Sequence, residues 1–205
     1  MSAPQTARTE AQRERILAAA QRCFIRHGFH AAGMAGIAEA AGMSPGLIYR
    51  YFDSKNAIIL AIIERQLLER RAGIDSLPAQ PDWEQRIREL FLGWQRGEDT
   101  WMNAALFLET SAQATRDPAV ASALAAADAD IREHFLAWMR AQAQAQAASV
   151  DEADLRARAL ALQSFIEGLA IRAVREPLLE DVRVAAAMRQ LLPSLLHFPA
   201  PTSKP

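Results

Sequence analysis

The chain has 205 residues, of which 51% are hydrophobic and 23% are charged, and its formal net charge is −1. This length allows one large or two small domains, and no apolar run approaches the roughly 18–20 residues that a transmembrane helix needs. A single cysteine excludes an intrachain disulfide, and the polar N-terminal segment lacks the pattern of a secretory signal. We therefore expect a cytoplasmic protein.

The charge is distributed unevenly along the chain. Residues 1–60 carry seven basic and four acidic side chains, a net charge of +3, and the remainder of the chain carries −4. Nearly all of the basic residues are arginines, and the two lysines are Lys55 and Lys204. A basic N-terminal third is typical of a surface that neutralises the phosphates of a nucleic acid.

A flexible arm is expected at residues 1–9, followed by a first helix and then by a helix that ends in a tight turn. The apolar face of the helix before the turn is formed by Met34, Ile37, Ala38 and Ala41, which follow helical spacing. Gly42 comes directly after this face, at the place where a helix commonly ends in a left-handed residue. We expect Gly42 to adopt that conformation.

The turn leads into a second short helix. Ser44 has the side chain of an N-cap, and Pro45 suits the first helical position, where its missing N–H would have no partner. Met43 and Ile48 have the spacing of a hydrophobic staple, which fixes the angle at which the chain enters the helix. The spacing leaves four positions on the outer face of this helix: 45, 46, 49 and 50.

These segments resemble the DNA-binding domain of the tetracycline-repressor (TetR) family. The matching residues are Ile16-Leu17-Ala18-Ala19-Ala20, Phe24, Gly28-Phe29 and the run from Ile37 to Lys55. The resemblance covers roughly residues 10–60, and many turn and core residues recur in it at fixed spacing. One position departs from the family pattern. Gly33 stands where family members usually have Thr or Ser, so a side-chain contact with phosphate is absent there.

The chemistry of the residues and the resemblance together predict a DNA-contacting set. Its members are Gly33, Ser44, Pro45, Gly46, Leu47, Tyr49, Arg50, Tyr51 and Lys55. Arg50 is the candidate for a guanine edge, with a phosphate contact as its alternative, and Lys55 is expected to meet a phosphate. Tyr49 and Tyr51 can reach the DNA backbone with their hydroxyls, although Tyr49 could instead pack beside Ile48.

Beyond residue 56 the chain is expected to be helical throughout. The expected helices are 57–71, 83–94, 101–115, a long helix from about 120 to 141–148, 151–174 and 181–196, before a disordered tail at 199–205. No alternation typical of strands occurs. The predicted fold class is all-α, with a three-helix helix-turn-helix domain at 10–56 joined to a helical ligand-binding and dimerisation domain at 57–198.

The last two helices are apolar on more than one face, which indicates partners on both sides. TetR-like proteins pair through a four-helix bundle in this region. The resemblance therefore implies a dimer interface at Phe165, Gly168, Leu169, Arg172, Met188, Leu191, Leu192 and Leu195. The alternative is that both helices are buried in their own domain. An isologous homodimer would read a palindromic operator.

The resemblance also implies a cavity for a small apolar or amphipathic effector. Its candidate wall residues are Trp94, Trp101, Met102, Phe107, Glu109, Phe135, Met139 and Phe165. For each apolar member the alternative is ordinary core packing. Glu109 could orient a cationic or hydroxylated ligand, or could pair with an arginine such as Arg172.

The function predicted is that of a transcriptional regulator, most simply a repressor that an effector releases from DNA. An activator or a ligand-independent regulator of the same fold is the alternative. An enzyme is disfavoured because the sequence has no phosphate-binding loop, nucleophile elbow or metalloprotease motif, and a metal site because no two histidines have ligand spacing. A protein-binding adaptor is disfavoured by the basic bias around Tyr49, Tyr51 and Lys55. No cofactor is expected.

Overall fold

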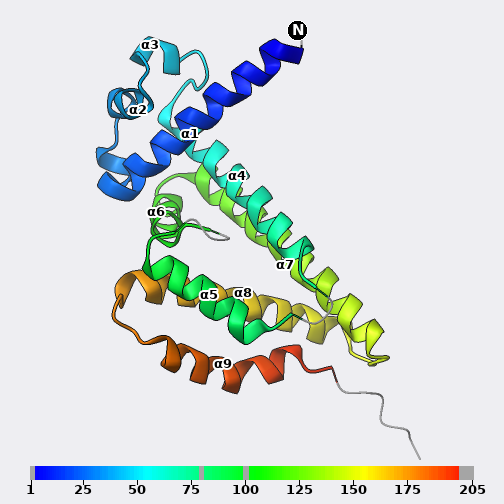
Figure 1. Ribbon diagram of the computed structural model, residues 1–205. Coiled ribbons are helices and arrows are strands. Elements are labelled where there is room, and N and C mark those ends of the chain that lie inside the picture. The colour runs from blue at the N-terminus through cyan, green and yellow to red at the C-terminus, as the bar shows by residue number, and fades with distance from the viewer. Residues whose placement is uncertain (1–2, 79–80, 99–101, 199–205) are drawn as a thin grey trace, which may run out of the picture. The chain divides into compact units, whose positions relative to one another are not determined.

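The computed structural model describes residues 3–78, 81–98 and 102–198, and every regular element within these ranges is a helix (Figure 1). The helices are α1 (Ala3–Ala31), α2 (Met34–Ala41), α3 (Pro45–Ile48), α4 (Lys55–Asp75), α5 (Trp83–Gln95), α6 (Ala104–Ala114), α7 (Pro118–Ala145), α8 (Glu152–Arg175) and α9 (Asp181–Leu196). The predicted all-α class is confirmed. None of the described helices has an apolar stretch long enough to cross a membrane.

The chain forms two compact units. Each unit is built from two separate stretches of the chain, whereas the sequence predicted a single boundary between residues 56 and 57. The first unit contains Met1–Gln66 and Ala105–Ala125, and the second contains Leu67–Ala104 and Ala126–Pro205. Helices α4 and α7 therefore contribute residues to both units. The α6–α7 corner belongs with the helix-turn-helix because side chains at Glu109 and Asp117 hydrogen-bond to it.

The turn between α2 and α3 has the predicted chemistry. Gly42 is left-handed, with φ 62° and ψ 40°, and the Met43 N–H donates to the Ala38 carbonyl at 2.9 Å, as in a Schellman ending. Ser44 occupies the N-cap position in an extended conformation, but its hydroxyl makes no capping bond to the described part of the helix. Pro45 is the first residue of α3, as expected.

Two helix boundaries in this unit differ from the prediction. Helix α1 begins at Ala3, so most of the segment expected as a flexible arm at 1–9 is helical. Helix α3 has only one α-helical turn, and the chain continues to Phe52 through further hydrogen bonds, including one from the Phe52 N–H to the Ile48 carbonyl at 3.0 Å. The core under these helices is closed by Ile16, Phe24, Ile37 and Ile48, all 0% exposed.

In the second unit α5 packs against α8 and α9, which also contact each other (Figure 1). Helix α5 begins after Asp82, whose carboxylate accepts the Gln85 N–H at 2.9 Å. The Trp83 and Trp138 rings meet edge to face, with their centroids 5.1 Å apart. Helix α9 spans the predicted 181–196, whereas α6 starts three residues later than predicted, and the tail at 199–205 lies outside the described residues.

Candidate nucleic-acid interface

The outer face of α3 presents the residues that were predicted to meet DNA. Pro45, Gly46 and Arg50 are exposed, and Leu47 is half-buried. A Cβ atom added at Gly46 would meet nothing within 4 Å, so the backbone itself forms the surface there. Within the described part of the chain no hydrogen bond or ion pair engages the Arg50 side chain, and its backbone N–H donates to the Leu47 carbonyl at 3.2 Å. Its guanidinium is therefore available for a base edge or a phosphate.

The two tyrosines of this segment have different environments. Tyr49 is 52% exposed, so packing beside Ile48 does not account for most of its surface. Tyr51 is half-buried, and its carbonyl oxygen accepts a hydrogen bond from Arg13 Nη1 at 2.8 Å. The same guanidinium lies 4.3 Å from the centre of the Phe52 ring. Sequence reasoning missed Arg13, because it precedes Tyr51 by 38 residues.

The start of α2 is a second place where backbone faces outward. Gly33 is its N-cap residue, exposed and extended with φ −96°, and its carbonyl accepts the Ile37 N–H at 3.0 Å. Glycine serves here without a side-chain cap, as expected. The first N–H groups of α2 point outward in the orientation that favours a bound anion. Gly33 has no hydroxyl that could donate a further hydrogen bond to that anion.

Lys55 begins α4, two residues before the expected start of this helix, and its ammonium already has a protein partner. Lys55 Nζ donates to the carbonyl oxygen of Phe29, at the end of α1. The N–H of Phe29 donates to Glu109 Oε2 at 3.1 Å. Glu109 lies at an open pocket of about 470 Å³ in the first unit, beside Gly28 and Phe29, and its carboxylate caps the backbone of the helix-turn-helix unit. It does not pair with Arg172, which bonds to Glu176.

The second unit contains a small cavity of about 20 Å³, between α4, α5, α7 and α8. Its wall is formed by Arg70, Ile74, Trp94, Met102, Ile131, Phe135, Gln163, Ile166 and Glu167. A space of this size holds about one water molecule, far less than the roughly 300–1,000 Å³ of a typical ligand pocket. Three of the residues predicted for an effector cavity line this space: Trp94, Met102 and Phe135.

The other predicted wall residues are elsewhere. Met139 is fully buried in the core, and Phe165 is half-buried on α8 without lining the cavity. Phe107 lies on α6 in the first unit, as does Glu109. Trp101 lies outside the described residues. The helical periodicity placed Met139 on a buried face, but it could not show which face borders the cavity.

Sequence reasoning also missed the charged residues of the cavity. Burial lowers the pKa of the Arg70 guanidinium and raises the pKa of the Glu167 carboxyl, because both lose hydration. The Arg70 Nη2 lies 4.0 Å from Asp128 Oδ1, so this carboxylate offsets the lost hydration of the guanidinium only weakly. The Arg70 Nε is buried without a hydrogen-bond partner in the described structure. Glu167 accepts a bond from Gln163 Nε2 at 2.8 Å.

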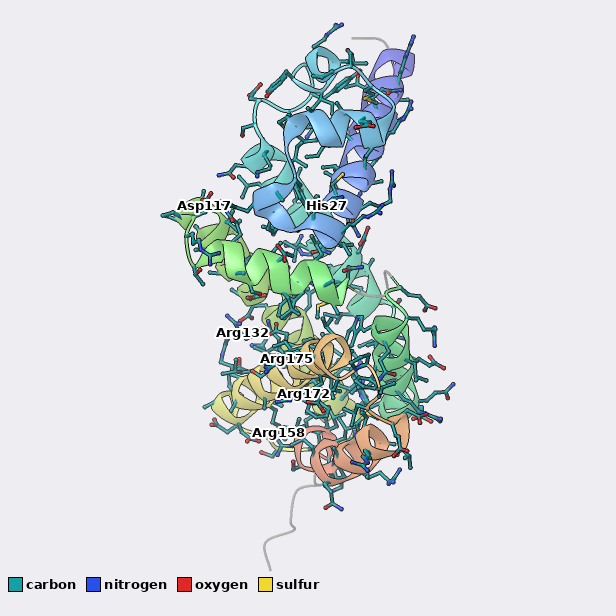
Figure 2. All side chains as sticks on the ribbon, turned by 90° about the vertical axis from the view of Figure 1, so that its left-hand side faces the viewer. His27, Asp117, Arg132, Arg158, Arg172 and Arg175 are labelled. Carbon is teal, nitrogen blue, oxygen red and sulfur yellow. The ribbon has the colours of Figure 1, made fainter. Side chains whose placement is uncertain are left out.

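The predicted dimer residues divide into buried and accessible groups. Met188 is 0% exposed and belongs to the core of its own chain, so assigning it to the interface was wrong. Leu169, Leu192 and Leu195 are also buried, at 7–8% exposure. The accessible members are Phe165, Gly168, Leu191 and Arg172, the last of which is labelled on α8 in Figure 2.

No group of three or more potential metal ligands comes together among the described residues. His134, the histidine nearest to acidic side chains, lies 3.4 Å from Asp130 and 3.9 Å from Asp75. Its Nδ1 also lies 3.0 Å from the Asp130 carbonyl. These contacts are those of a local surface cluster.

A basic unit that exposes a short helix after a glycine turn, joined to a second helical unit, defines a helix-turn-helix DNA-binding regulator. Residues 16–62 match the family described as bacterial regulatory proteins, tetR family, and residues 83–197 match the BetI-type transcriptional repressor C-terminal family. The chain belongs to the TetR family of transcriptional regulators.

Named relatives agree with this assignment. The HTH-type transcriptional regulator UidR of Escherichia coli K12 is 36% identical over 138 residues, which is 64% of this chain and 67% of UidR. The solved structure of Salmonella enterica GusR has 30% identity and a TM-score of 0.74, and covers 91% of this chain and 95% of its own. The transcriptional activator FasR of Mycolicibacterium smegmatis is 37% identical over 78 residues, 38% of this chain and 36% of FasR.

Proposed function

We propose that this regulator is a cytoplasmic homodimeric repressor that binds a palindromic operator and releases it when a small amphipathic molecule enters the cavity of the second unit. The carrying observation is the wall of that cavity, which combines the half-buried Arg70 and Glu167 with Trp94 and Phe135. A charge that burial partly dehydrates is costly when its polar atoms lack partners, as the Arg70 Nε does, and a ligand with complementary polar groups would relieve that cost. No enzymatic activity is part of the proposal.

The size of the cavity makes ligand binding a conformational event. A molecule larger than water needs the helices that form the wall to separate, because the present volume is about 20 Å³. Helix α4 carries Arg70 in the second unit and Lys55 in the first. A shift of α4 at the cavity would therefore act on a helix that also carries a proposed DNA contact. A coupling of about 1–3 kcal/mol would weaken DNA binding by roughly 5- to 150-fold.

The test begins with the operator, since the genes beside it indicate the chemical class of the effector. The full chain is used to enrich fragments from genomic DNA, and compounds related to the neighbouring genes are titrated into the complex. The expected result is release of DNA by a compound that also changes tryptophan fluorescence, with loss of both effects in Phe135→Ala. Compounds that bind the cavity and leave operator affinity unchanged would contradict the release mechanism.

We place the proposed dimer interface on the accessible surface of α8 and α9. Phe165, Gly168 and Leu191 leave apolar or small surface on these helices, which a second copy of the chain would cover. Phe165→Arg is expected to yield monomers in light-scattering measurements and to weaken operator binding. Ala137→Arg, at an exposed position of α7 outside the proposed interface, is the matched control. If Phe165→Arg remains dimeric, this face is not the interface.

An activator is the second candidate, because FasR is named as one. A reporter gene placed behind the selected operator distinguishes the two directions of regulation, since deleting a repressor raises expression and deleting an activator lowers it. A protein-binding adaptor would behave differently from both. Its DNA binding would lack the steep salt dependence that phosphate contacts produce.

A further inference from the structure

The backbone of Phe29 is held on both sides by charged side chains from two other helices. Gly28 interrupts the helical hydrogen bonding of α1, with φ 74° and ψ 163°, a conformation that essentially only glycine adopts. The Phe29 N–H donates instead to Glu109 Oε2 at 3.1 Å, and the Phe29 carbonyl accepts from Lys55 Nζ. Phe29 is only 4% exposed, so these partners replace water that cannot reach its backbone.

Glu109 and Gly28 are fitted to each other as well. A Cβ atom at Gly28 would lie 3.3 Å from Glu109 Oε2 and 3.6 Å from Oε1. Glycine thus supplies both the backbone angle and the room that the carboxylate needs to approach. The contact joins α6 to the end of α1, 80 residues earlier in the chain.

A second contact ties the next residue of α4 to the same corner. Asn56 Nδ2 donates to Asp117 Oδ2, and Asp117 Oδ1 accepts the Ala119 N–H at 3.0 Å, at the start of α7. Figure 2 labels Asp117 at this corner. The Val120 N–H and the Asn56 amide lower the pKa of the Asp117 carboxyl, which keeps it charged at neutral pH. The first two residues of α4 are therefore both held by the α6–α7 corner, Lys55 through the Phe29 peptide and Asn56 directly.

We propose that Glu109 is a positioning residue for DNA binding, which holds the Phe29 peptide in the orientation that aims the Lys55 ammonium at a phosphate. The inference rests on the proposed phosphate contact of Lys55. Lysine has three donor hydrogens, so one bond to a carbonyl fixes its direction and leaves two for the phosphate. The carbonyl is uncharged, and the positive charge of Lys55 stays available to DNA.

The experiment compares variants of the full chain by titrating the DNA fragment enriched from genomic DNA over a range of salt concentrations. Lys55→Ala is expected to weaken binding and to reduce the salt slope by about 0.9 for each protomer on the DNA, which corresponds to the loss of one phosphate contact per protomer. Glu109→Ala is expected to weaken binding roughly tenfold and to flatten the slope in the same way. In the double variant, the Glu109 substitution is expected to have no further effect, because its action passes through Lys55.

Two further variants separate the hydrogen bond from the charge. Glu109→Gln loses the charge but keeps an oxygen that can accept the Phe29 N–H, so it is expected to bind DNA as tightly as the parent. Glu64→Gln, an exposed position of α4 in the same unit, measures the effect of removing one negative charge. If the alanine variant at Glu109 does not fold, Asn56→Ala removes the second tie to the corner, and its effect should likewise vanish beside Lys55→Ala.

The outcomes distinguish the two levels of the proposal. If Lys55→Ala leaves the affinity and the salt slope unchanged, the phosphate contact itself is wrong. If Lys55→Ala has its expected effect but the Glu109 or Asn56 substitution adds to it independently, the contact stands and the positioning role is overturned. Equal loss of binding in Glu109→Gln and Glu109→Ala would also overturn it, because the charge and not the hydrogen bond would then be responsible.

Discussion

Arg13 on α1 supports the recognition segment through Tyr51. Its Nη1 donates to the Tyr51 carbonyl at 2.8 Å, and its guanidinium lies over the Phe52 ring at 4.3 Å. One side chain thus holds the peptide between Tyr51 and Phe52 and covers the aromatic ring of Phe52, which closes the segment. The C-terminal part of the recognition segment, where α3 has already ended, is fixed from outside by α1.

Replacing Arg13 by alanine should therefore weaken both the unit and its binding to DNA. The charged hydrogen bond and the contact with Phe52 together are worth about 1–2 kcal/mol at this half-buried position. Thermal unfolding and gel-shift titration measure the two effects. Arg8→Ala, at an exposed position of the same helix, removes an equal charge and serves as the control. Identical affinities for the two variants would mean that Arg13 contributes its charge alone.

Arg50 should contribute to sequence preference more than to general affinity. A bidentate contact with a guanine edge discriminates against other bases by about 1–3 kcal/mol, so Arg50→Ala should relax the preference at one base pair. Gel-shift titrations against operators substituted at single positions, at one fixed salt concentration, measure this. Uniform weakening across all sequences, as expected for Lys55→Ala, would assign Arg50 to a phosphate instead.

Gly42 and Gly46 should respond to the same substitution with opposite signs. Gly42→Ala places a side chain at φ 62°, which costs about 1–2 kcal/mol of unfolding free energy, and the new Cβ would lie 2.7 Å from Arg15 Nη2. Gly46→Ala meets open space inside a helix and should stabilise the fold by about 0.5–1 kcal/mol. Urea unfolding measures both. Gly46→Ala should nevertheless weaken DNA binding, because it adds a methyl group to the outer face.

The parts of the site that sequence reasoning predicted depend on neighbouring residues. The left-handed Gly42, Pro45 at the first helical position and the outward direction of Arg50 all follow from local backbone rules, and each is confirmed. The end of α3 was less predictable, because the Phe52 N–H still bonds to Ile48 after the regular helix has ended.

The parts that it missed depend on contacts between distant segments. Glu109 sits in an apolar sequence context that suggested a cavity, yet its partner is the Phe29 N–H, which is free only because Gly28 breaks α1. Met188 shows the same limit, since helical periodicity cannot separate a face buried in its own chain from a face that a second copy would cover. Arg70 and Glu167 meet in one cavity although almost 100 residues separate them, and no local pattern marks such a pair.

The half-buried carboxyl of Glu167 should make the protein less stable as the pH rises. Burial raises its pKa above the usual range, so the folded state holds this proton more tightly than the unfolded state does. The contribution of Glu167 to the unfolding free energy therefore falls as the pH rises from its unfolded pKa through its folded pKa, and stays low above it. Glu167→Gln removes this cost and should be more stable than the parent at neutral pH, with the difference shrinking in acid.

Asp130 provides a control whose stability should change with pH in the opposite direction, and urea unfolding over a range of pH measures both variants. The hydrogen bonds from Arg71 lower the pKa of its carboxyl, so its contribution is present above the unfolded pKa and is lost as the pH falls through the folded pKa. Asp130→Asn should therefore be less stable than the parent at neutral pH and approach it in acid. If Glu167→Gln instead loses stability at neutral pH, its attraction to Arg70 and Arg132 outweighs the cost of burial, and the carboxylate is part of the structural core of the cavity.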